Sequence, residues 1–321
     1  MLKTFQSTIE RSLRQITTNY LSGRGLVPEK KEFKNAATKL HKYMLQSYSC
    51  KKENDNILSI VFSKDRAMQL DAFLVSYLEQ VSNHGPMIIL YKCSDEKHAE
   101  SYRNLLLLYE SEDMTFIEET DFREQLISII AESNHGKVIL YCDDMIFTHK
   151  IDYVELQSIN TSEETLALTR GGDLDYSVVL DRELPIPPLT RHTENLQSFR
   201  WDHFDFFSDW TYPLGTTGYL YGTAELLSLM NVVEFTAPNS FETSMQVFRP
   251  YFMTRTGLCT KFATCVCVHA NLTQTEGENR VIGTFSIEEL LDYWEEKKRI
   301  KVCEFYNLPS RTTQFQAYTF I

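Results

Sequence analysis

The chain has 321 residues, 43% of them hydrophobic, and a formal net charge of −12. This length suits one large domain or two small ones, and the acidic charge argues against a nucleic-acid partner, which needs basic surfaces. No apolar run reaches the ~18 residues of a membrane span, so the sequence predicts no span and no signal peptide. The seven cysteines, an odd number without a C-x-x-C pair, predict free thiols and a cytoplasmic location.

Residues 1–55 are predicted to form a helical extension, because apolar side chains recur at helical spacing, first around Leu13 and then around Leu40. We expect this extension to pack on the main domain. A partner-binding surface is the alternative interpretation of the same pattern.

Buried strands alternate with amphipathic helices from residue 56 onward. Strands are predicted at 57–62, 87–91, 114–117 and 138–142, with helices at 96–109 and 122–131 and another directly after the first strand. This alternation predicts an α/β fold, with a mostly parallel central sheet, right-handed crossovers and flanking helices.

The pattern changes after residue 144. Further strands are predicted at 165–169, 216–221 and 264–268, helices at 224–230, from 238 and at 286–298, and a proline-rich loop at 183–191. The aromatic residues between Phe199 and Tyr212 follow no single period. We interpret this segment as mobile or as a recognition surface, with core packing as the alternative.

The stretch 138–147 carries two adjacent carboxylates, Asp143 and Asp144, at the end of a buried strand. Buried carboxylates are costly unless a cation meets them. Because ligands of open α/β sheets bind at the carboxyl ends of the strands, a divalent metal that carries phosphates is a natural counter-charge. The alternatives are that the pair caps the next segment or binds an arginine.

The order of these motifs resembles glycosyltransferases of the GT-A fold. The first strand ends in Ser63-Lys64-Asp65-Arg66, strand–helix units follow, a hydrophobic strand ends in Asp143-Asp144, and a Gly/Thr-rich strand at 215–221 precedes a helix with Glu242. The segments FSKDRAMQLDAFLVSYLEQ, PNSFE and FSIEELLDYWEEKKRI resemble small bacterial glycosyltransferase-like proteins of surface-glycan gene clusters.

The resemblance covers residues 56–321 and implies a GT-A-like (Rossmann-like) domain. Residues 56–150 would form the half that binds a nucleotide-sugar, and residues 151–321 would form the acceptor side of the same domain. The segment 199–212 would then be the acceptor-side wall and would become ordered when the donor binds.

The resemblance also implies a metal. Asp143-Asp144 would stand for the family's Asp-x-Asp motif, with Asp144 as a ligand of Mn²⁺ or Mg²⁺ and Asp143 nearer the donor's ribose. The chain departs from that motif, because Cys142 occupies the position two before Asp144. His269, at the end of a late strand, would add a metal or diphosphate contact. Its alternative is a hydrogen-bonded core histidine.

Donor-binding roles follow from the same resemblance. Ser63, Asp65 and Arg66 would lie in the nucleotide-binding loop, Asp95 would contact the base, and Arg170 would help to neutralise the diphosphate. Two alternatives stay open. Arg66 pairs with a nearby carboxylate, and Asp95 caps the helix that follows it.

Glu242 would be the catalytic base, with Asp209 as the next candidate, although Glu242 is also placed to complement a helix dipole. The implied reaction is an inverting, metal-assisted transfer of a sugar from a nucleotide-sugar donor to a glycan or glycolipid hydroxyl, as in polysaccharide biosynthesis. The alternative is a non-catalytic module that binds a nucleotide or glycan. A phosphatase of the haloacid dehalogenase type needs Asp-x-Asp after the first strand, where this chain has Ser63-Lys64-Asp65-Arg66.

Overall fold

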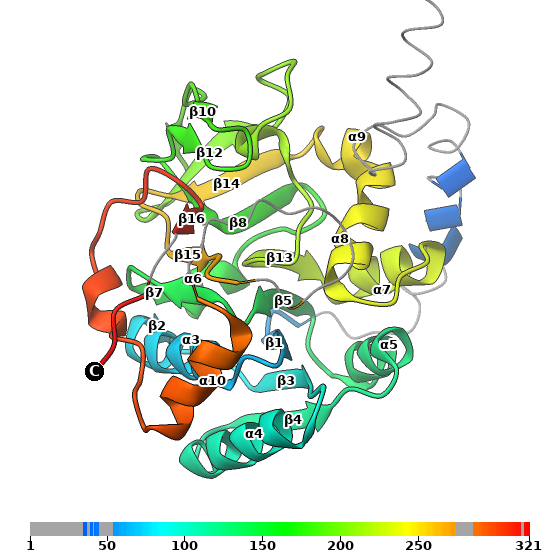
Figure 1. Cartoon of the computed structure of the whole chain (residues 1–321). Coiled ribbons are helices and arrows are strands. Elements are labelled where there is room, and N and C mark those ends of the chain that lie inside the picture. The colour runs from blue at the N-terminus through cyan, green and yellow to red at the C-terminus, as the bar shows by residue number, and fades with distance from the viewer. Residues whose placement is uncertain are drawn as a thin grey trace, which may run out of the picture.

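The computed structural model describes residues 54–271, 273, 285–315 and 318–321, together with short helical pieces within 35–44 (Figure 1). The helix expected around Leu13 lies outside these residues. Around Leu40 the described residues are helical, and the Leu40 side chain is buried in a core cluster of the main domain. Among the described helices, none is long and apolar enough to cross a membrane.

One nine-stranded sheet organises the domain. Its strands are β1 (Ile57–Lys64), β3 (Met87–Lys92), β4 (Met114–Glu118), β5 (Lys137–Cys142), β8 (Glu164–Gly171), β11 (Thr190–Arg191), β12 (Leu196–Arg200), β13 (Tyr219–Gly222) and β14 (Thr256–Thr260). They lie in the order β11-β12-β14-β8-β13-β5-β1-β3-β4. The pairs β1–β3, β1–β5, β3–β4 and β8–β14 are parallel, whereas β13 is antiparallel to β5 and β8. The predicted α/β fold with a mostly parallel sheet is confirmed.

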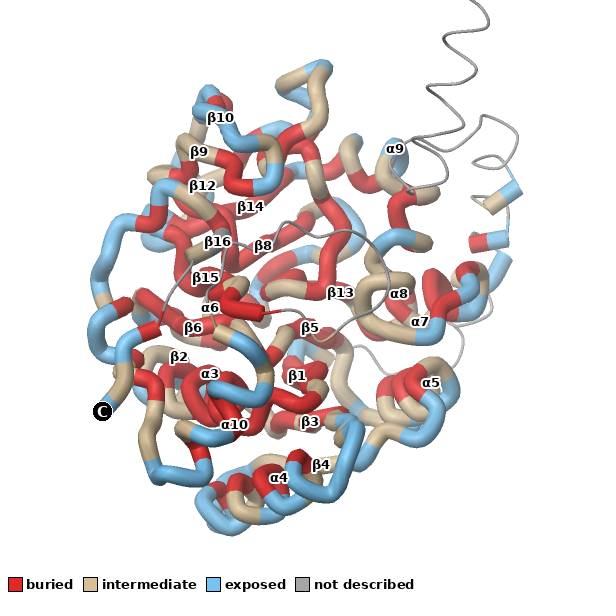
Figure 2. The backbone as a smooth tube through the Cα atoms, viewed as in Figure 1, coloured by how far each residue is buried: buried red, intermediate tan, exposed pale blue. Residues whose placement is uncertain are grey.

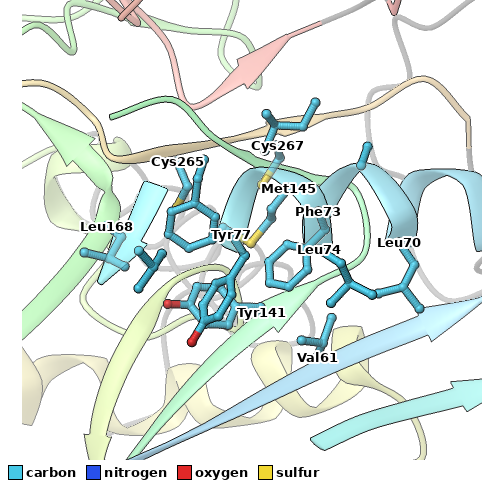
Figure 3. Packing of buried hydrophobic residues seen from close by; sticks show 14 of the residues in the cluster. Val61, Leu70, Phe73, Leu74, Tyr77, Tyr141, Met145, Leu168, Cys265 and Cys267 are labelled. Atoms are coloured by element: carbon cyan, nitrogen blue, oxygen red, sulfur yellow. The ribbon is translucent and has the colours of Figure 1, made fainter. Parts of the chain in front are cut away.

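Helices cover both faces of this sheet. One face carries α3 (Ala67–Gln80), α4 (Glu96–Leu108) and α10 (Ile287–Glu295), and the other carries α5 (Phe122–Glu132), α7 (Thr223–Val232) and α8 (Pro238–Met245). Strand residues alternate between the two resulting cores, so Val61 packs with α3 whereas Ile60 and Phe62 face α5. Figure 2 shows buried strands between helices whose outer sides are exposed, and Figure 3 shows Phe73 and Tyr77 of α3 close to Tyr141 of β5.

A smaller sheet begins where β5 ends. It consists of β6 (Met145–Phe147), β15 (Cys265–Val268) and β16 (Gln314–Phe315). Asp143 and Asp144 form the turn that leads the chain from β5 into β6. The carboxylate pair therefore lies where the chain passes from the large sheet to the small one.

The remaining elements are short. They are β2 (Val81–Ser82), β7 (Ile151–Asp152), β9 (Tyr176–Ser177), β10 (Arg182–Glu183), α6 (Tyr153–Gln157), α9 (Arg249–Phe252) and the 3-10 helices η1 (Asp209–Thr211), η2 (Gln246–Phe248) and η3 (Val302–Phe305). Two predicted element boundaries differ from those in the structure. The helix predicted at 286–298 stops at Glu295, because Lys297 has a left-handed φ of 66°. The strand predicted at 216–221 begins at Tyr219, after Gly218 with φ 76°.

The aromatic segment 199–212 is anchored in the core. Trp201 is 0% exposed and Trp210 is 1% exposed, and both rings contact Phe199 edge-on. The Trp210 indole N–H also donates to the carbonyl oxygen of Leu174 at 3.0 Å. The interpretation of this segment as a mobile or recognition surface is therefore wrong for its two tryptophans, and the packing alternative holds.

We expect Trp201→Ala and Trp210→Ala each to lower the free energy of unfolding by about 3–5 kcal/mol, because each removes a large buried ring. Urea denaturation of the two variants measures this loss. Phe206→Ala is the matched control, since the Phe206 ring is only half-buried in the same segment. Tryptophan variants no less stable than the control would contradict the core assignment.

Candidate active site

The Asp143-Asp144 pair already has a cationic partner. Arg66, in the loop after β1, donates from Nη1 to Oδ1 of Asp143 at 3.0 Å and to Oδ2 of Asp144 at 3.2 Å. Burial alone lowers the pKa of Arg66, but the charges of the two carboxylates outweigh burial and raise it. The structure therefore agrees with the alternative in which the carboxylate pair binds an arginine.

Both oxygens of Asp143 already accept hydrogen bonds from the protein. Its Oδ2 accepts hydrogen bonds from the Ser63 hydroxyl at 2.9 Å and from the backbone N–H of Lys64 at 3.1 Å. Burial raises the pKa of Asp143 to about 6, although Arg66 lowers it. Because Ser63 and Asp143 bind each other, these two predicted donor contacts lie together but serve first to join the ends of β1 and β5.

Asn271 is a residue of this site that the sequence did not indicate. Arg66 donates from Nε to its Oδ1 at 2.9 Å and from Nη2 to its backbone oxygen at 2.6 Å. Arg66 therefore makes four hydrogen bonds to protein groups, which leaves one of its five N–H donors. Arg66 lies 205 positions from Asn271, and no local sequence signal connects residues so far apart.

The other predicted nucleotide contacts, Asp65 and Asp95, are also engaged. Both carboxylate oxygens of Asp65 bind Ser94, at 2.7 Å to its N–H and 2.6 Å to its hydroxyl. Asp95 caps α4 and accepts from the N–H of His98 at 3.0 Å. The capping alternative for Asp95 is thus present, and its exposed position leaves the predicted contact with a base untested.

Asp144 and His269 provide atoms that suit a metal shared with a ligand. Oδ1 of Asp144 accepts no hydrogen bond from the described residues. Burial lowers the pKa of His269, while Asp144 raises it, and a neutral imidazole is the form that binds metals. Within the described ranges no three His, Cys, Asp or Glu side chains form a metal-binding group. Since Mg²⁺ is commonly held by one or two carboxylates plus substrate phosphates, these residues fit a metal only together with a diphosphate.

Arg170 is a buried cation near the end of β8. It is 5% exposed, and its guanidinium donates to the Thr169 hydroxyl at 2.6 Å and to the backbone oxygen of Asp209 at 3.2 Å. Burial lowers the pKa of Arg170, but the side chains around it, Tyr219 and Asp209 first, raise it. No described carboxylate forms a salt bridge with it. Within the part of the chain that the structure describes, Arg170 is therefore a buried cation without a carboxylate in salt-bridge contact.

Glu242, on α8, is held by the loop that precedes β13. Its Oε1 accepts from the Tyr212 hydroxyl at 3.0 Å, and its Oε2 accepts from the N–H and the hydroxyl of Thr216 at 2.8 and 2.9 Å. Among the described residues, the carboxylate of Asp209, the second candidate base, accepts one long hydrogen bond, from the Thr313 hydroxyl at 3.4 Å.

Glu242 and Asp144 both raise the pKa of the same two thiols, Cys142 and Cys267. Sγ of Cys142 lies 4.0 Å from the carbonyl oxygen of Thr216. The pKa of Cys142 is raised by burial and then by the charges of Asp144, Asp143 and Glu242. Burial and the charges of Asp144 and Glu242 also raise the pKa of Cys267 on β15. Asp144 and Glu242 therefore lie within electrostatic reach of the same two thiols.

Comparison with known proteins supports the resemblance seen in the sequence. No protein-family model matches the chain. The chain is similar to the bifunctional glycosyltransferase pgtA of Dictyostelium discoideum, with 26% identity over 218 residues that cover 60% of this chain and 28% of the relative. The chain thus matches less than a third of that relative's length. The likeness to glycosyltransferases is confirmed, whereas the likeness to bacterial surface-glycan proteins stays a prediction.

Solved glycosyltransferase structures are similar only at a distance. S. aureus TarS 1–349 in complex with UDP-GlcNAc has 16% identity and a TM-score of 0.39, covering 70% of this chain and 60% of that one. The mannosyltransferase PcManGT of Pyrobaculum calidifontis, in complex with GDP-Man and Mn²⁺, has 10% identity and a TM-score of 0.27, covering 46% and 51%. At these scores no residue of either protein is matched to a residue of this chain.

Proposed function

We propose that the chain is a nucleotide-sugar-dependent glycosyltransferase that inverts the anomeric centre and acts on a hydroxyl of a glycan or glycolipid. The observation that carries the proposal is that Asp144, Glu242 and the buried Arg170, which forms no salt bridge with a carboxylate of the described residues, all interact electrostatically with Cys267. A buried cation with no carboxylate partner suits a diphosphate, and a fixed carboxylate beside it suits an acceptor hydroxyl. The similarity to a glycosyltransferase supports the same reaction class.

The proposed chemistry assigns one task to each side chain. Glu242 takes the proton of the acceptor hydroxyl while that oxygen forms a bond to the anomeric carbon. The bond from the anomeric carbon to the donor's phosphate oxygen breaks, and its electron pair leaves with the nucleoside diphosphate. Arg170 stabilises the charge that develops there. Mn²⁺ or Mg²⁺, held by Asp144 and His269 together with the diphosphate, would add further charge stabilisation.

A non-catalytic binding module is the second candidate. It is supported by the contacts of Arg66, which already neutralises part of the Asp143-Asp144 charge. Such a module would bind nucleotides or glycans without breaking the donor's glycosidic bond.

Ligand binding and donor turnover separate the two candidates. A panel of nucleotide-sugars with Mn²⁺ should include one donor that stabilises the protein, by about 2.7 kcal/mol at 100 times its Kd. The glycosyltransferase is expected to hydrolyse that donor slowly and to transfer its sugar when an acceptor is added. Binding without either reaction would favour the module, and no binding by any nucleotide would defeat the glycosyltransferase and the nucleotide-binding form of the module.

Asp144→Asn tests the proposed metal contact. We expect the Mn²⁺-dependent affinity for a nucleoside diphosphate to fall about tenfold or more, because an amide oxygen is a far weaker metal ligand than a carboxylate. Titration calorimetry with and without Mn²⁺ measures this change. Asp202→Asn, an exposed carboxylate paired with Arg200, is the matched control. Equal metal enhancement in both variants would remove Asp144 from the metal site.

We also propose a cytoplasmic location. The cysteines of the described residues, Cys93, Cys142, Cys259, Cys265, Cys267 and Cys303, are free thiols. Free thiols are the usual state in a reducing compartment.

A further inference from the structure

The carboxylate of Glu242 is held asymmetrically by its protein neighbours. Its Oε2 accepts two hydrogen bonds, both from Thr216, whereas its Oε1 accepts one, from the Tyr212 hydroxyl. A carboxylate has about four lone-pair sites, two on each oxygen. Oε2 is therefore saturated, and Oε1 retains a site for one more donor.

Several backbone contacts fix the loop that makes these bonds. The Gln246 amide donates to the carbonyl oxygen of Leu214 at 3.0 Å, and Nε of Arg249 donates to that of Thr211 at 2.7 Å. Thr216 itself is 2% exposed. Leu214 in the loop between η1 and β13 and Thr211 at the end of η1 are thus tied to Gln246 and Arg249, which follow α8, so the position of Thr216 relative to the carboxylate is set by the fold.

We propose that Thr216 is a positioning residue: it occupies Oε2 of Glu242 and so leaves Oε1 as the atom that takes the proton of the acceptor hydroxyl. This inference rests on the proposed function. Thr216 touches neither donor nor acceptor and acts only through Glu242. Its two hydrogen bonds orient the carboxylate that acts as the base.

The other groups around Glu242 stay the same when Thr216 changes. Burial and the charge of Glu242 raise the pKa of Tyr212, so its hydroxyl remains a donor to Oε1. The titratable and charged groups that interact electrostatically with Glu242 are Tyr212, Tyr219, Tyr221, Arg170, Cys142 and Cys267. Burial raises the pKa of both cysteines, which keeps them neutral, and Arg170 is the cation of the set.

Thr216→Val tests the proposal, because valine has the same shape but lacks the hydroxyl. We expect kcat to fall about tenfold through poorer orientation. The acidic limb of the kcat–pH profile should move to higher pH, because the carboxylate loses the hydrogen bond from the Thr216 hydroxyl. Thr216→Ser restores the hydroxyl and should return the limb to its wild-type position. The donor KM should stay unchanged in both variants.

Tyr221→Phe is the matched control. The Tyr221 hydroxyl binds the N–H and the carbonyl oxygen of Gly215 at 3.0 and 2.7 Å, in the same loop, without touching Glu242. This variant should melt at a lower temperature than wild type but keep the acidic limb in place. If Thr216→Val does not fold, Tyr212→Phe removes the donor to Oε1 and should move the limb in the same direction.

The outcomes distinguish this inference from the function on which it rests. If the wild-type protein transfers sugar from no donor, the proposed function fails. If it transfers sugar and the acidic limb stays in place in Thr216→Val, only the positioning role is overturned. A limb that moves equally in Tyr221→Phe would also overturn it, because the effect would then come from a loosened loop.

Discussion

Glu242→Gln is expected to retain donor binding and to lose transfer by about 10²–10⁴-fold, the usual contribution of a positioned base. Glutamine keeps the length of the side chain, and its single amide oxygen can still accept from Thr216 while its NH2 group can donate to the Tyr212 hydroxyl oxygen, the two groups that bind Glu242 in the structure. The amide has no basicity, so the acceptor hydroxyl keeps its proton as it attacks. Single-turnover transfer and titration with the nucleoside diphosphate measure the two effects separately.

Glu234→Gln provides the control for that change. Glu234 is exposed and lies just before α8, so the variant loses the same charge without touching the site. Wild-type transfer by the Glu242 variant would place the base elsewhere, and Asp209 would be the next residue to replace.

Arg66→Met is expected to cost about 3–5 kcal/mol of unfolding free energy and to abolish donor binding. The guanidinium forms salt bridges with both Asp143 and Asp144, and removing one member of a buried ion pair leaves an uncompensated charge. Adding Asp143→Asn to the variant should recover part of the loss, because an amide needs no counter-charge. Chemical denaturation of the single and double variants measures the loss of unfolding free energy and its partial recovery.

Arg103→Met shows what an exposed ion pair contributes by comparison. Arg103 binds Glu96 and Glu100 on the surface of α4 and is about half exposed. Exposed pairs contribute roughly 0–1 kcal/mol, so the control should be close to wild type. An Arg66 variant as stable as the Arg103 variant would mean that the carboxylate pair needs no cation.

The strands and helices that the sequence predicts well are those with a strong local pattern. Val138 to Tyr141 is a continuous apolar run, and the alternation of its residues between two cores follows from the strand period of two. Ser286 and Glu289 predict the start of α10, and both bonds of that capping box are present. β14 escaped prediction because Thr256–Thr260 contains one large apolar side chain, and its place beside β8 depends on tertiary pairing.

The candidate site is less accessible to sequence reasoning, because its decisive contacts join distant parts of the chain. The carboxylates of Asp143 and Asp144 could be recognised as unusual, but the choice between a metal and Arg66 depends on a loop 77 residues away. Thr216 carries no signal at all, since its role comes from α8 lying against it. The burial of Trp201 and Trp210 is not predictable for a similar reason, because local periodicity does not show how a loop folds onto a core.

The position of β13 in the sequence has a consequence for folding during synthesis on the ribosome. β1, β3, β4 and β5 are complete once residue 142 has emerged, but the edge of β5 is covered only by β13, which begins at residue 219. β5 is almost entirely buried in the finished protein, and an open apolar edge of this kind pairs readily with other chains. During synthesis there is therefore an interval in which the sheet of the nascent chain is incomplete and the edge of β5 is unpaired. A pause or truncation in this interval favours aggregation over folding.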